Sequence, residues 1–283
     1  MSALVVTGTD TGAGKTLVTA AIAAALRARG VRIGVAKPAE TGCPRRADGL
    51  YPEDAATLAA AAAVWSPASP ASPVSSVAAP VARAAASGID AAAATTETLD
   101  VVCPYRFPDP LAPMLAAARV GTTIDVAALV GALTARATDV DVLLIEGAGG
   151  VLVPLTAAVT YADLARMLDA PVLLVVGSRL GAINHALLSL EALRTRGVRI
   201  TGYVVNRLAP AGDLAVDTNT DLLRGLTADR FLGELPHITD VAETLRALRA
   251  GGAAAHAART RLAALASAHI DLDALVAAGH RRA

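Results

Sequence analysis

The sequence predicts an α/β fold in a single domain, in which a mostly parallel central sheet carries helices on both faces. Short apolar runs rich in β-branched residues occupy residues 3–7, 31–36, 140–145, 171–176 and 200–205. These runs do not alternate with polar residues, which is typical of strands that helices bury on both sides. Segments of helical length lie between them, and this alternation of strand and helix favours a parallel sheet.

The joint between a helix and the next strand appears twice in the same form. The string Arg-Gly-Val-Arg-Ile occupies residues 29–33 and again residues 196–200. A basic residue in a last helical turn, followed by glycine, marks the end of a helix. We therefore expect helices to end near Gly30 and Gly197 and strands to follow directly.

Composition excludes several classes of protein. The chain has 283 residues, no formal net charge, and only 2% aromatic residues, so Val, Leu and Ala must fill the core. It lacks a basic run that would bind nucleic acid, an apolar stretch of ~20 residues that would span a membrane, and an export signal. Cys43 and Cys103 have no metal-ligand spacing and indicate no disulfide framework. We expect a cytoplasmic protein without nucleic-acid or membrane partners.

Residues 65–96 break the pattern, because they are Ala, Pro and Ser with few charges. Four prolines there prevent a continuous helix. We interpret this segment as a surface insertion into a domain that spans residues 1–243. Residues 244–283 are rich in Ala and Arg, and we expect them to form a helical C-terminal extension.

The first of only two lysines lies in a glycine-rich loop, beside twenty-three arginines in the whole chain. Residues 8–16 read GTDTGAGKT, follow a predicted strand and open a helix, which is the context of a phosphate-binding loop. There Lys15 would reach the outer phosphates and Thr16 would offer a hydroxyl to Mg²⁺. Thr9 occupies the position where the first glycine of such a loop is usual. The alternative to a phosphate-binding loop is a glycine turn between strand and helix that binds no ligand. The loop predicts a fold like that of P-loop NTPases.

The second lysine, Lys37, closes the next predicted strand and precedes Pro38, so the chain leaves the sheet in an extended conformation. An ammonium is a compact charge that fits between phosphate oxygens, whereas a guanidinium is a planar fork. Two lysines near one nucleotide indicate phosphoryl-group chemistry. The alternative for Lys37 is an ordinary lysine at a strand end.

Two acidic residues are candidates to hold magnesium. Glu146 ends a predicted strand at the edge where parallel sheets bind ligands, and glycines follow it, although a solvated acid before a turn would look the same. Asp54 opens a predicted helix, where an acid ordinarily serves the helix dipole. The company of Thr16 and Glu146 makes it a candidate, since Mg²⁺ takes few carboxylates together with water and phosphate oxygens.

Two later positions are less specific. Asn206 ends a strand and can either pair with the edge of a base or cap a turn. A helix that begins near Gly181 offers free N–H groups that suit a carboxylate. We expect His185 in that helix to be a packed residue, because no second His or Cys lies at metal spacing.

Together these strings resemble the dethiobiotin synthetase family over about residues 5–243, apart from the insertion. They are TGTDT and GKT within 7–16, KP and TG within 37–42, PYRF with Pro110, EGAGG at 146–150, LGAINH at 180–185, Asn206, and GELP at 233–236. The resemblance implies a homodimer with its substrate site at the dimer interface. It also implies Mg²⁺ as cofactor and ATP as co-substrate.

The reaction that the resemblance implies joins 7,8-diaminononanoate and CO₂, with ATP, into dethiobiotin, ADP and phosphate. One amine captures CO₂ as a carbamate, the carbamate attacks the γ-phosphate, and the second amine closes the ring on the mixed anhydride. Lys37 and Lys15 are then the catalytic residues. The implied metal set is Thr16, Asp54 and Glu146.

Other roles follow from the resemblance by position. The nucleotide phosphates would lie on Gly12, Ala13, Gly14, Lys15, Thr16 and Leu17, with Asp54, Glu146, Gly147, Ala148 and Gly149 beside them. The base would lie against Asn206, Arg207, Pro236, His237, Ile238 and Glu243. The substrate would contact Lys37, Thr41, Gly149, Gly181, Ala182 and Asn184.

The chain departs from the family at Gly12 and Ala13, where Glu and Val are common. Two alternatives stay open. A cobyrinate amidase-like ATPase would need a nucleophilic cysteine, and neither cysteine lies in a recognisable elbow. A nucleotide switch or partition-type ATPase would place a lysine early in the loop, where this chain has Gly8, Thr9 and Asp10.

Overall fold

The computed structural model describes residues 3–64 and 98–279, so the predicted insertion at 65–96 lies outside the described residues. Six strands form one sheet in the order β10-β9-β8-β1-β7-β2, and every neighbouring pair is parallel. The strands are β1 (Ala3–Gly8), β2 (Ile33–Ala36), β7 (Val142–Gly150), β8 (Val172–Ser178), β9 (Ile200–Arg207) and β10 (Phe231–Leu235). The predicted parallel α/β fold is confirmed, and each of the five predicted runs overlaps a strand of this sheet.

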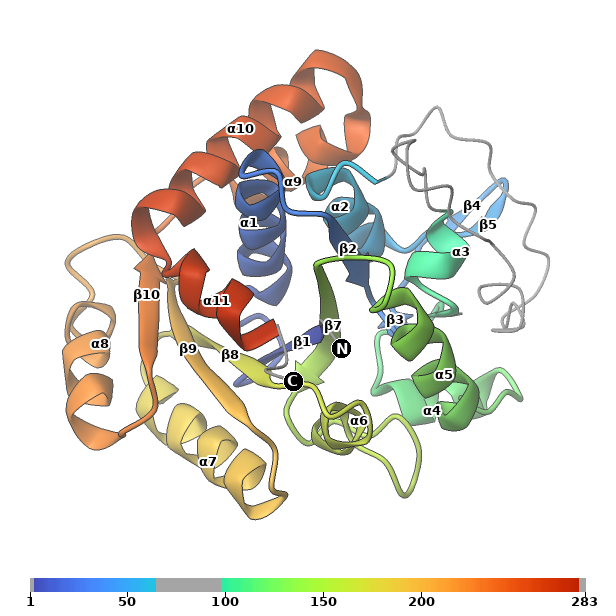
Figure 1. Cartoon of the computed structure of the whole chain (residues 1–283), viewed down its shortest axis with the longest axis horizontal. Coiled ribbons are helices and arrows are strands. Elements are labelled where there is room, and N and C mark those ends of the chain that lie inside the picture. The colour runs from blue at the N-terminus through green and yellow to red at the C-terminus, as the bar shows by residue number, and fades with distance from the viewer. Residues whose placement is uncertain (1–2, 65–97, 280–283) are drawn as a thin grey trace.

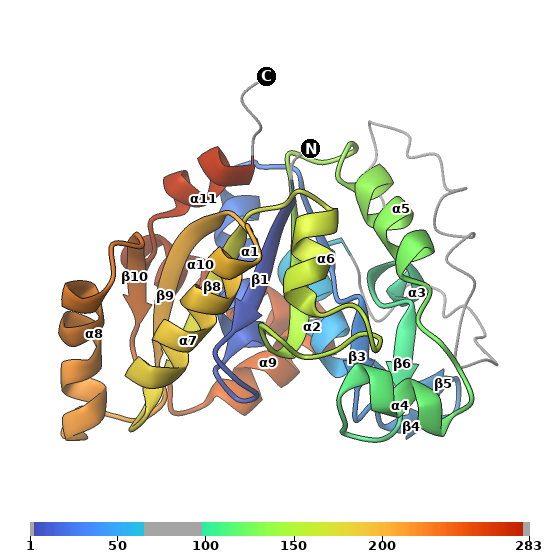
Figure 2. The ribbon, with the colours of Figure 1, turned by 90° about the horizontal axis from the view of Figure 1, so that it is seen from below.

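Helices cover both faces of the sheet, as Figures 1 and 2 show. One layer holds α1 (Lys15–Ala28), α2 (Glu53–Ala61), α9 (Val241–Ala250), α10 (Gly252–His269) and α11 (Leu272–Gly279). The other holds α4 (Pro113–Arg119), α5 (Val126–Arg136), α6 (Tyr161–Met167), α7 (Ala182–Thr195) and α8 (Leu214–Leu226). Successive side chains of a strand point to opposite faces, so Leu4 and Val6 enter one core cluster and Val5 enters the other.

The alanine content has a structural purpose in α1. Leu17 and the residues from Val18 to Leu26 are all buried, and half of these ten residues are alanine. The small side chains let α1 lie between the sheet and α10, which packs along its outer side (Figure 1). Close packing of this kind replaces the large aromatic side chains that the chain lacks.

The last helices return to the edge strand β10. Ile270 bridges to Gly233, and Asp271 N donates to Leu232 O at 2.7 Å. The C-terminal segment thereby contacts an edge that would otherwise present bare N–H and C=O groups. Within the described residues, this segment forms the helices α9, α10 and α11.

Several short elements lie beside the main sheet and were not predicted. The strand β3 (Ala39–Thr41) pairs in parallel with β6 (Tyr105–Phe107), and β4 (Arg45–Arg46) pairs with β5 (Gly49–Leu50) as a hairpin. A short helix, α3 (Leu99–Val102), precedes β6. The chain leaves β2 at Lys37 and Pro38 as predicted, and β3 then carries Thr41 along the same end of the sheet.

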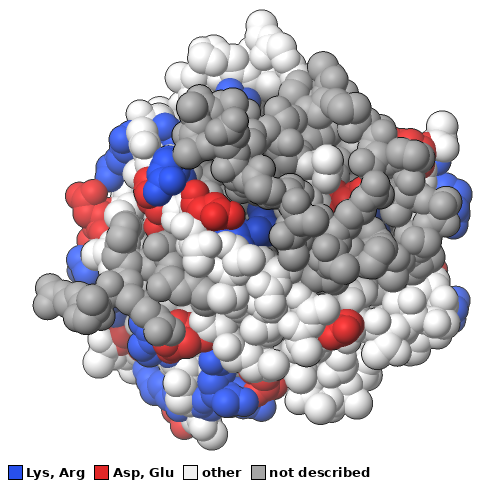
Figure 3. All heavy atoms as spheres, turned by 45° about the vertical axis from the view of Figure 1, so that its right-hand side comes forward, with Lys and Arg blue, Asp and Glu red and all other residues white. Residues whose placement is uncertain are grey.

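The surface carries both signs of charge. On the face drawn in Figure 3, the coloured acidic and basic side chains lie interspersed, with white areas between them. Among the described helices, none combines the length and the apolar character needed to cross a membrane.

Candidate active site

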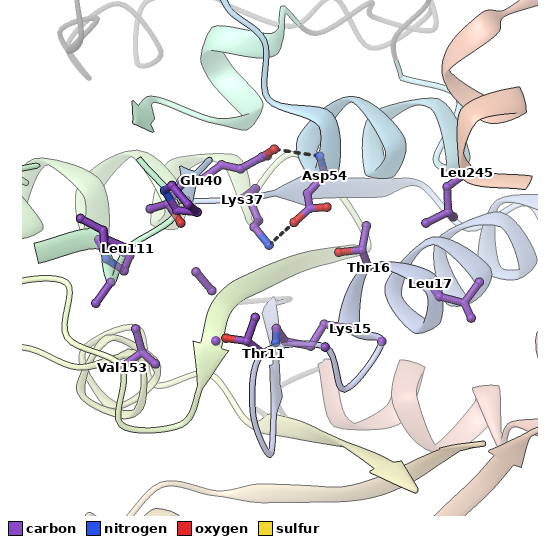
Figure 4. Close-up of a pocket in the computed structure, with 18 of the residues that line it drawn as sticks. Thr11, Lys15, Thr16, Leu17, Lys37, Glu40, Asp54, Leu111, Val153 and Leu245 are labelled. Carbon is purple, nitrogen blue, oxygen red and sulfur yellow. Dashed lines mark hydrogen bonds and ion pairs between the residues drawn. The ribbon is translucent and has the colours of Figure 1, made fainter. Parts of the chain in front are cut away.

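A cavity of about 740 Å³ opens at the carboxyl ends of β1, β2 and β7 (Figure 4). Both lysines line it, together with Asp54 and Thr16. Its remaining lining comes from the phosphate loop, β3, the loop before α4, the end of β7 and α9: Thr11, Gly12, Gly14, Leu17, Glu40, Thr41, Pro110, Leu111, Ala112, Pro113, Ala148, Gly149, Val153, Val241 and Leu245.

The phosphate loop is shaped by a backbone turn that favours glycine. Gly14 has φ of 88° and precedes α1 without a side-chain cap, so the first-turn N–H groups of α1 stay available for an anion. A Cβ on Gly14 would collide with the amide nitrogen of Asn206. That nitrogen donates to Ala13 O at 3.1 Å. Asn206 therefore supports the loop from β9, and its amide group is not directed to open solvent.

Lys15 is almost buried and folds back over the loop. Its Nζ donates to Asp10 O at 2.9 Å. Burial and, to a smaller extent, the nearby charge of Lys37 lower the pKa of Lys15 to about 8. Asp10 in turn forms an ion pair with Arg179, which follows β8. A phosphate oxygen is the anion that would suit this partly desolvated ammonium.

Lys37 lies at the centre of the charged cluster. Its Nζ donates to Asp54 Oδ2 at 3.0 Å (Figure 4). It also donates to Glu146 Oε1 at 2.6 Å, and the side chain is buried. Burial lowers the pKa of Lys37, but Asp54, Glu146 and Glu40 together raise it well above its usual value. Residue 37 is therefore a fixed ammonium beside the cavity.

Glu146 is fully buried and lies inside β7, opposite Val6 of β1. The strand continues to Gly150, so the expected strand end at residue 146 is wrong, and burial excludes the alternative of a solvated acid. The glycines after Glu146 continue the strand, because Gly150 pairs with Gly8 across the sheet. Glu146 Oε1 accepts from Thr16 Oγ1 at 2.9 Å, whereas Oε2 has no hydrogen-bond partner within the described part of the chain.

Asp54 lies in the first turn of α2 and stays partly exposed toward the cavity. Burial raises the pKa of Asp54, but the Lys37 ammonium and the Thr16 hydroxyl lower it below its usual value. The oxygens of Asp54, Thr16 and Glu146 thus face one region, and Glu146 Oε2 has no partner among residues 3–64 and 98–279. This donor set fits Mg²⁺, which draws its other ligands from phosphate and water. Among the described residues, no group of three or more His, Cys, Asp or Glu is placed to hold a metal.

Glu40 belongs to the same cluster and was missed from the sequence. Its Oε1 accepts from Asp54 N and its Oε2 from Ala55 N, both at 2.9 Å. Burial and, to a smaller extent, the nearby Asp54 carboxylate raise the pKa of Glu40 to about 8. One signal was available: α2 begins after Pro52, which offers no side-chain cap, so its first N–H groups need an acceptor from elsewhere.

Several other expected residues do meet at the cavity. Gly12, Gly14, Leu17, Thr41, Ala148 and Gly149 line it. Ala13 is buried beneath the loop, and Gly147 O accepts from Lys37 Nζ at 3.4 Å. These expected residues, which come from the loop after β1, from the start of α1, and from β3 and β7, therefore line or adjoin one cavity.

The remaining expected residues lie apart from the cavity lining. Arg207 forms ion pairs with Asp217 and with Glu234, the latter at 3.2 Å. Gly181 caps α7 beside Leu180, whose exposed fraction is 88%. Outside the lining are Ala182, Asn184, Asn206, Arg207, Pro236, His237, Ile238 and Glu243. Val241 and Leu245 of α9 instead form an apolar wall with Leu17 at the end of the cavity next to α1.

Comparison with known proteins gives consistent relatives. A family model described as an AAA domain matches residues 2–102 and 55–244. The ATP-dependent dethiobiotin synthetase of Anaeromyxobacter sp. (strain Fw109-5) is 37% identical over 253 residues, which is 88% of this chain and 96% of that protein. The synthetase of Xylella fastidiosa is 37% identical over 238 residues, or 84% and 91% of the two chains.

Solved structures share the fold at lower identity. A ParA family ATPase from Chlorobium tepidum has a TM-score of 0.56 at 11% identity and covers 98% of each chain. The septum site-determining protein MinD of Pyrococcus horikoshii, complexed with Mg-ADP, has a TM-score of 0.55 at 18% identity, with 92% and 93% of the chains covered. At these identities the likeness concerns the fold alone.

Proposed function

The chain belongs to the dethiobiotin synthetase family, and we propose that the cavity between its phosphate loop and β3 is where it closes the ureido ring of dethiobiotin. The protein is an ATP-dependent ligase of biotin biosynthesis. The observation that carries the assignment of the site is that Lys15 and Lys37 line one cavity together with Thr16 and Asp54. The buried carboxylate of Glu146 lies directly behind them.

In this proposal the triphosphate lies on the loop of residues 12–17. The free N–H groups of α1 and the ammonium of Lys15 bind its oxygens, since a helix N-terminus and a lysine both favour anions. Thr16, Asp54 and Glu146 would hold Mg²⁺, which supplies positive charge to the β- and γ-phosphates. The partnerless oxygen of Glu146 supports that role.

Ring closure then needs no nucleophile from the protein. One amine of diaminononanoate attacks CO₂ and gives a carbamate. A carbamate oxygen attacks the γ-phosphorus and ADP leaves, which gives a mixed carbamic-phosphoric anhydride. The second amine attacks the carbamoyl carbon, phosphate leaves, and the amine loses its proton as the ureido ring closes.

Lys37 would stabilise the charge at that centre. A carbamate and a phosphate oxygen at 4 Å repel each other by about 4 kcal/mol at an effective dielectric of about 20. An ammonium between them removes this repulsion and stabilises negative charge on the transferring phosphoryl group. The raised pKa of Lys37 keeps that ammonium protonated near neutral pH.

The apolar side chains at the end of the cavity next to α4 suit the alkyl chain of the diamine. Pro110, Leu111, Pro113 and Val153 lie there, and Thr41 faces the same space. We assign the terminal carboxylate of the substrate to the start of α7 in a homodimer, at Gly181, Ala182 and Asn184. The support for a partner subunit at this place is Leu180, a large apolar side chain with 88% of its surface exposed.

One experiment tests the whole assignment. The enzyme is incubated with diaminononanoate, ¹³C-bicarbonate, ATP and Mg²⁺, and the product is analysed by mass spectrometry. We expect dethiobiotin with the label in its ureido carbonyl, and phosphate release that requires both the diamine and bicarbonate. Rapid ATP hydrolysis without the diamine, and no labelled product, would instead favour a nucleotide switch.

A further inference from the structure

We propose that Glu40 is a positioning residue that fixes Asp54 for magnesium and for Lys37, by accepting the first N–H groups of α2. This inference rests on the proposed function, because it gives Asp54 its role there. Glu40 would not touch the metal or the reacting atoms. It would act only through the backbone of Asp54 and Ala55, to which its two oxygens are bonded.

The geometry explains why a side chain from another strand is needed. Pro52 is the N-cap of α2 and makes no side-chain hydrogen bond. The first N–H groups of a helix have no partner within the helix. Glu40 in β3, fourteen residues before Asp54, supplies an acceptor to two of them at 2.9 Å each (Figure 4 shows the bond to Asp54). Only 5% of Glu40 is exposed, so water is poorly placed to substitute for it.

The bonds to Glu40 set the place of the Asp54 carboxylate. Asp54 Oδ2 lies 3.0 Å from Lys37 Nζ, and the side chain is partly exposed toward the cavity. A partly exposed carboxylate on a frayed turn would sample several positions. Groups that hold metal ligands from behind commonly change metal affinity about 10–100-fold when removed.

The rest of α2 is held independently of Glu40. Residues Ala55 to Ala61 are buried, and Ala55, Leu58 and Ala59 belong to the core cluster on that face. Arg249 of α9 donates to Thr57 Oγ1 at 2.9 Å, and Arg259 of α10 donates to Ala60 O at 3.0 Å. Loss of Glu40 should therefore loosen the first turn and leave the body of the helix in place.

The test measures ADP binding by calorimetry, with magnesium and again with a chelator. The quantity compared is the gain in ADP affinity that magnesium gives to each folded protein. We expect Glu40→Ala to reduce this gain about 10-fold while leaving metal-free ADP binding unchanged. In an Asp54→Ala background, Glu40→Ala should change nothing further, because a group that acts through Asp54 has no effect once that carboxylate is gone.

A matched control separates positioning from stability. Asp213 also accepts two helix N–H groups, those of Ala215 and Val216, but at α8 on the far end of the sheet. Asp213→Ala should lower the melting temperature without changing the magnesium-dependent gain. Glu40→Gln keeps one acceptor and should lose part of the gain, which carries the test if Glu40→Ala does not fold.

The outcomes distinguish this inference from the proposed function. A wild-type gain in Glu40→Ala, or in Glu40→Gln if only that variant folds, overturns the role of Glu40 and leaves the function standing. The same holds if Glu40→Ala lowers the gain further in the Asp54→Ala background. No magnesium-dependent gain in the wild-type enzyme overturns the metal set itself, and the inference with it.

Discussion

The two halves of the sheet's carboxyl edge are organised in opposite ways. At β1, β2 and β7, the charged side chains Lys37, Glu146 and Asp54 and the hydroxyl of Thr16 form one hydrogen-bonded cluster that lines or adjoins one cavity. At β9, β10 and the start of α7, Arg207 is paired with Asp217 and Glu234, while Leu180 and Asn184 face outward.

The difference shows which part of the site a single chain forms by itself and which part it leaves exposed to solvent. Buried charges are stable only when they are paired, so the half with Lys37 and Glu146 is already assembled without ligand. The half with α7 exposes a large apolar side chain, Leu180, at the start of that helix. We infer that phosphate chemistry is preorganised, whereas substrate recognition depends on a second subunit.

The largest expected effect comes from breaking the assembled half at Lys37. Lys37→Ala should lower kcat at least about 100-fold, because it removes charge stabilisation at the transferring phosphoryl group. It should also cost about 3–5 kcal/mol of unfolding free energy, since Glu146 stays buried without its cation. Dethiobiotin formation and chemical denaturation measure the two effects.

Two further variants serve as comparisons for Lys37→Ala. Lys37→Arg keeps a charge but introduces a planar fork, so it should recover stability more than turnover. Arg32→Ala removes an exposed partner of Asp141 and should leave the midpoint of chemical denaturation almost unchanged. A Lys37→Ala enzyme with wild-type kcat would refute the catalytic assignment.

The second-largest effect is expected where the two halves meet, at the contact between Asn206 of β9 and the phosphate loop. Gly14→Ala adds a Cβ at φ of 88° against the Asn206 amide, and should weaken ADP binding about 10-fold, or about 1.4 kcal/mol. Gly12→Ala is the matched control, with φ of 86° but no atom within 4 Å of the new Cβ. It should have a smaller effect, as should Gly14→Ala combined with Asn206→Ala. Equal losses of ADP affinity in all three variants would show that the contact with Asn206 is not the cause.

At the start of α7, a smaller effect is expected, and it concerns subunit association instead of phosphate chemistry. Leu180→Asp should convert a dimer of 28.4 kDa subunits into a monomer and raise KM for the diamine, with ADP binding unchanged. Leu214→Asp changes a similarly exposed leucine of α8, 83% exposed, and should leave the mass unchanged. Light scattering after gel filtration measures both. A monomeric wild-type enzyme with full activity would remove the need for a partner subunit.

The smallest effect is expected at Arg207. Because its guanidinium already pairs with Asp217 and Glu234, Arg207→Ala should change ADP affinity only about twofold, within the range of partly exposed ion pairs. Calorimetry with ADP measures it. A loss of about 10-fold would mean that Arg207 contacts the nucleotide directly and that the two halves are less distinct than we infer.

For the half of the edge at β1, β2 and β7, the sequence predicted the central strands and most of the charged site residues, but not the short strands or the true end of β7. Short β-branched apolar runs predicted the central strands, and together with the glycine-rich loop they placed Lys15, Lys37, Thr16 and Glu146 at one edge of the sheet. The short strands β3 and β6 were missed, because three residues show no periodicity and their pairing joins positions far apart in the chain. Glu146 was expected at a strand end, since glycines usually mark turns, whereas here they continue β7.

Glu40 was missed for a different reason. Between Ala39 and Thr41 it reads as an ordinary polar residue, and its partners are backbone N–H groups, which carry no sequence signal of their own. The uncapped start of α2 after Pro52 was the indirect sign. A side chain that acts on a distant backbone becomes visible only when both segments are placed in space.

The position of β1 has a consequence for how the chain folds as it is synthesised. This strand is made first but lies between β7 and β8, which begin at Val142 and Val172. At about 5–20 residues per second, the ribosome needs roughly 7–30 s to make the first of these neighbours. Throughout that interval the apolar nascent strand has no lateral partner, so early chaperone contact and slow, long-range closure are expected during biogenesis.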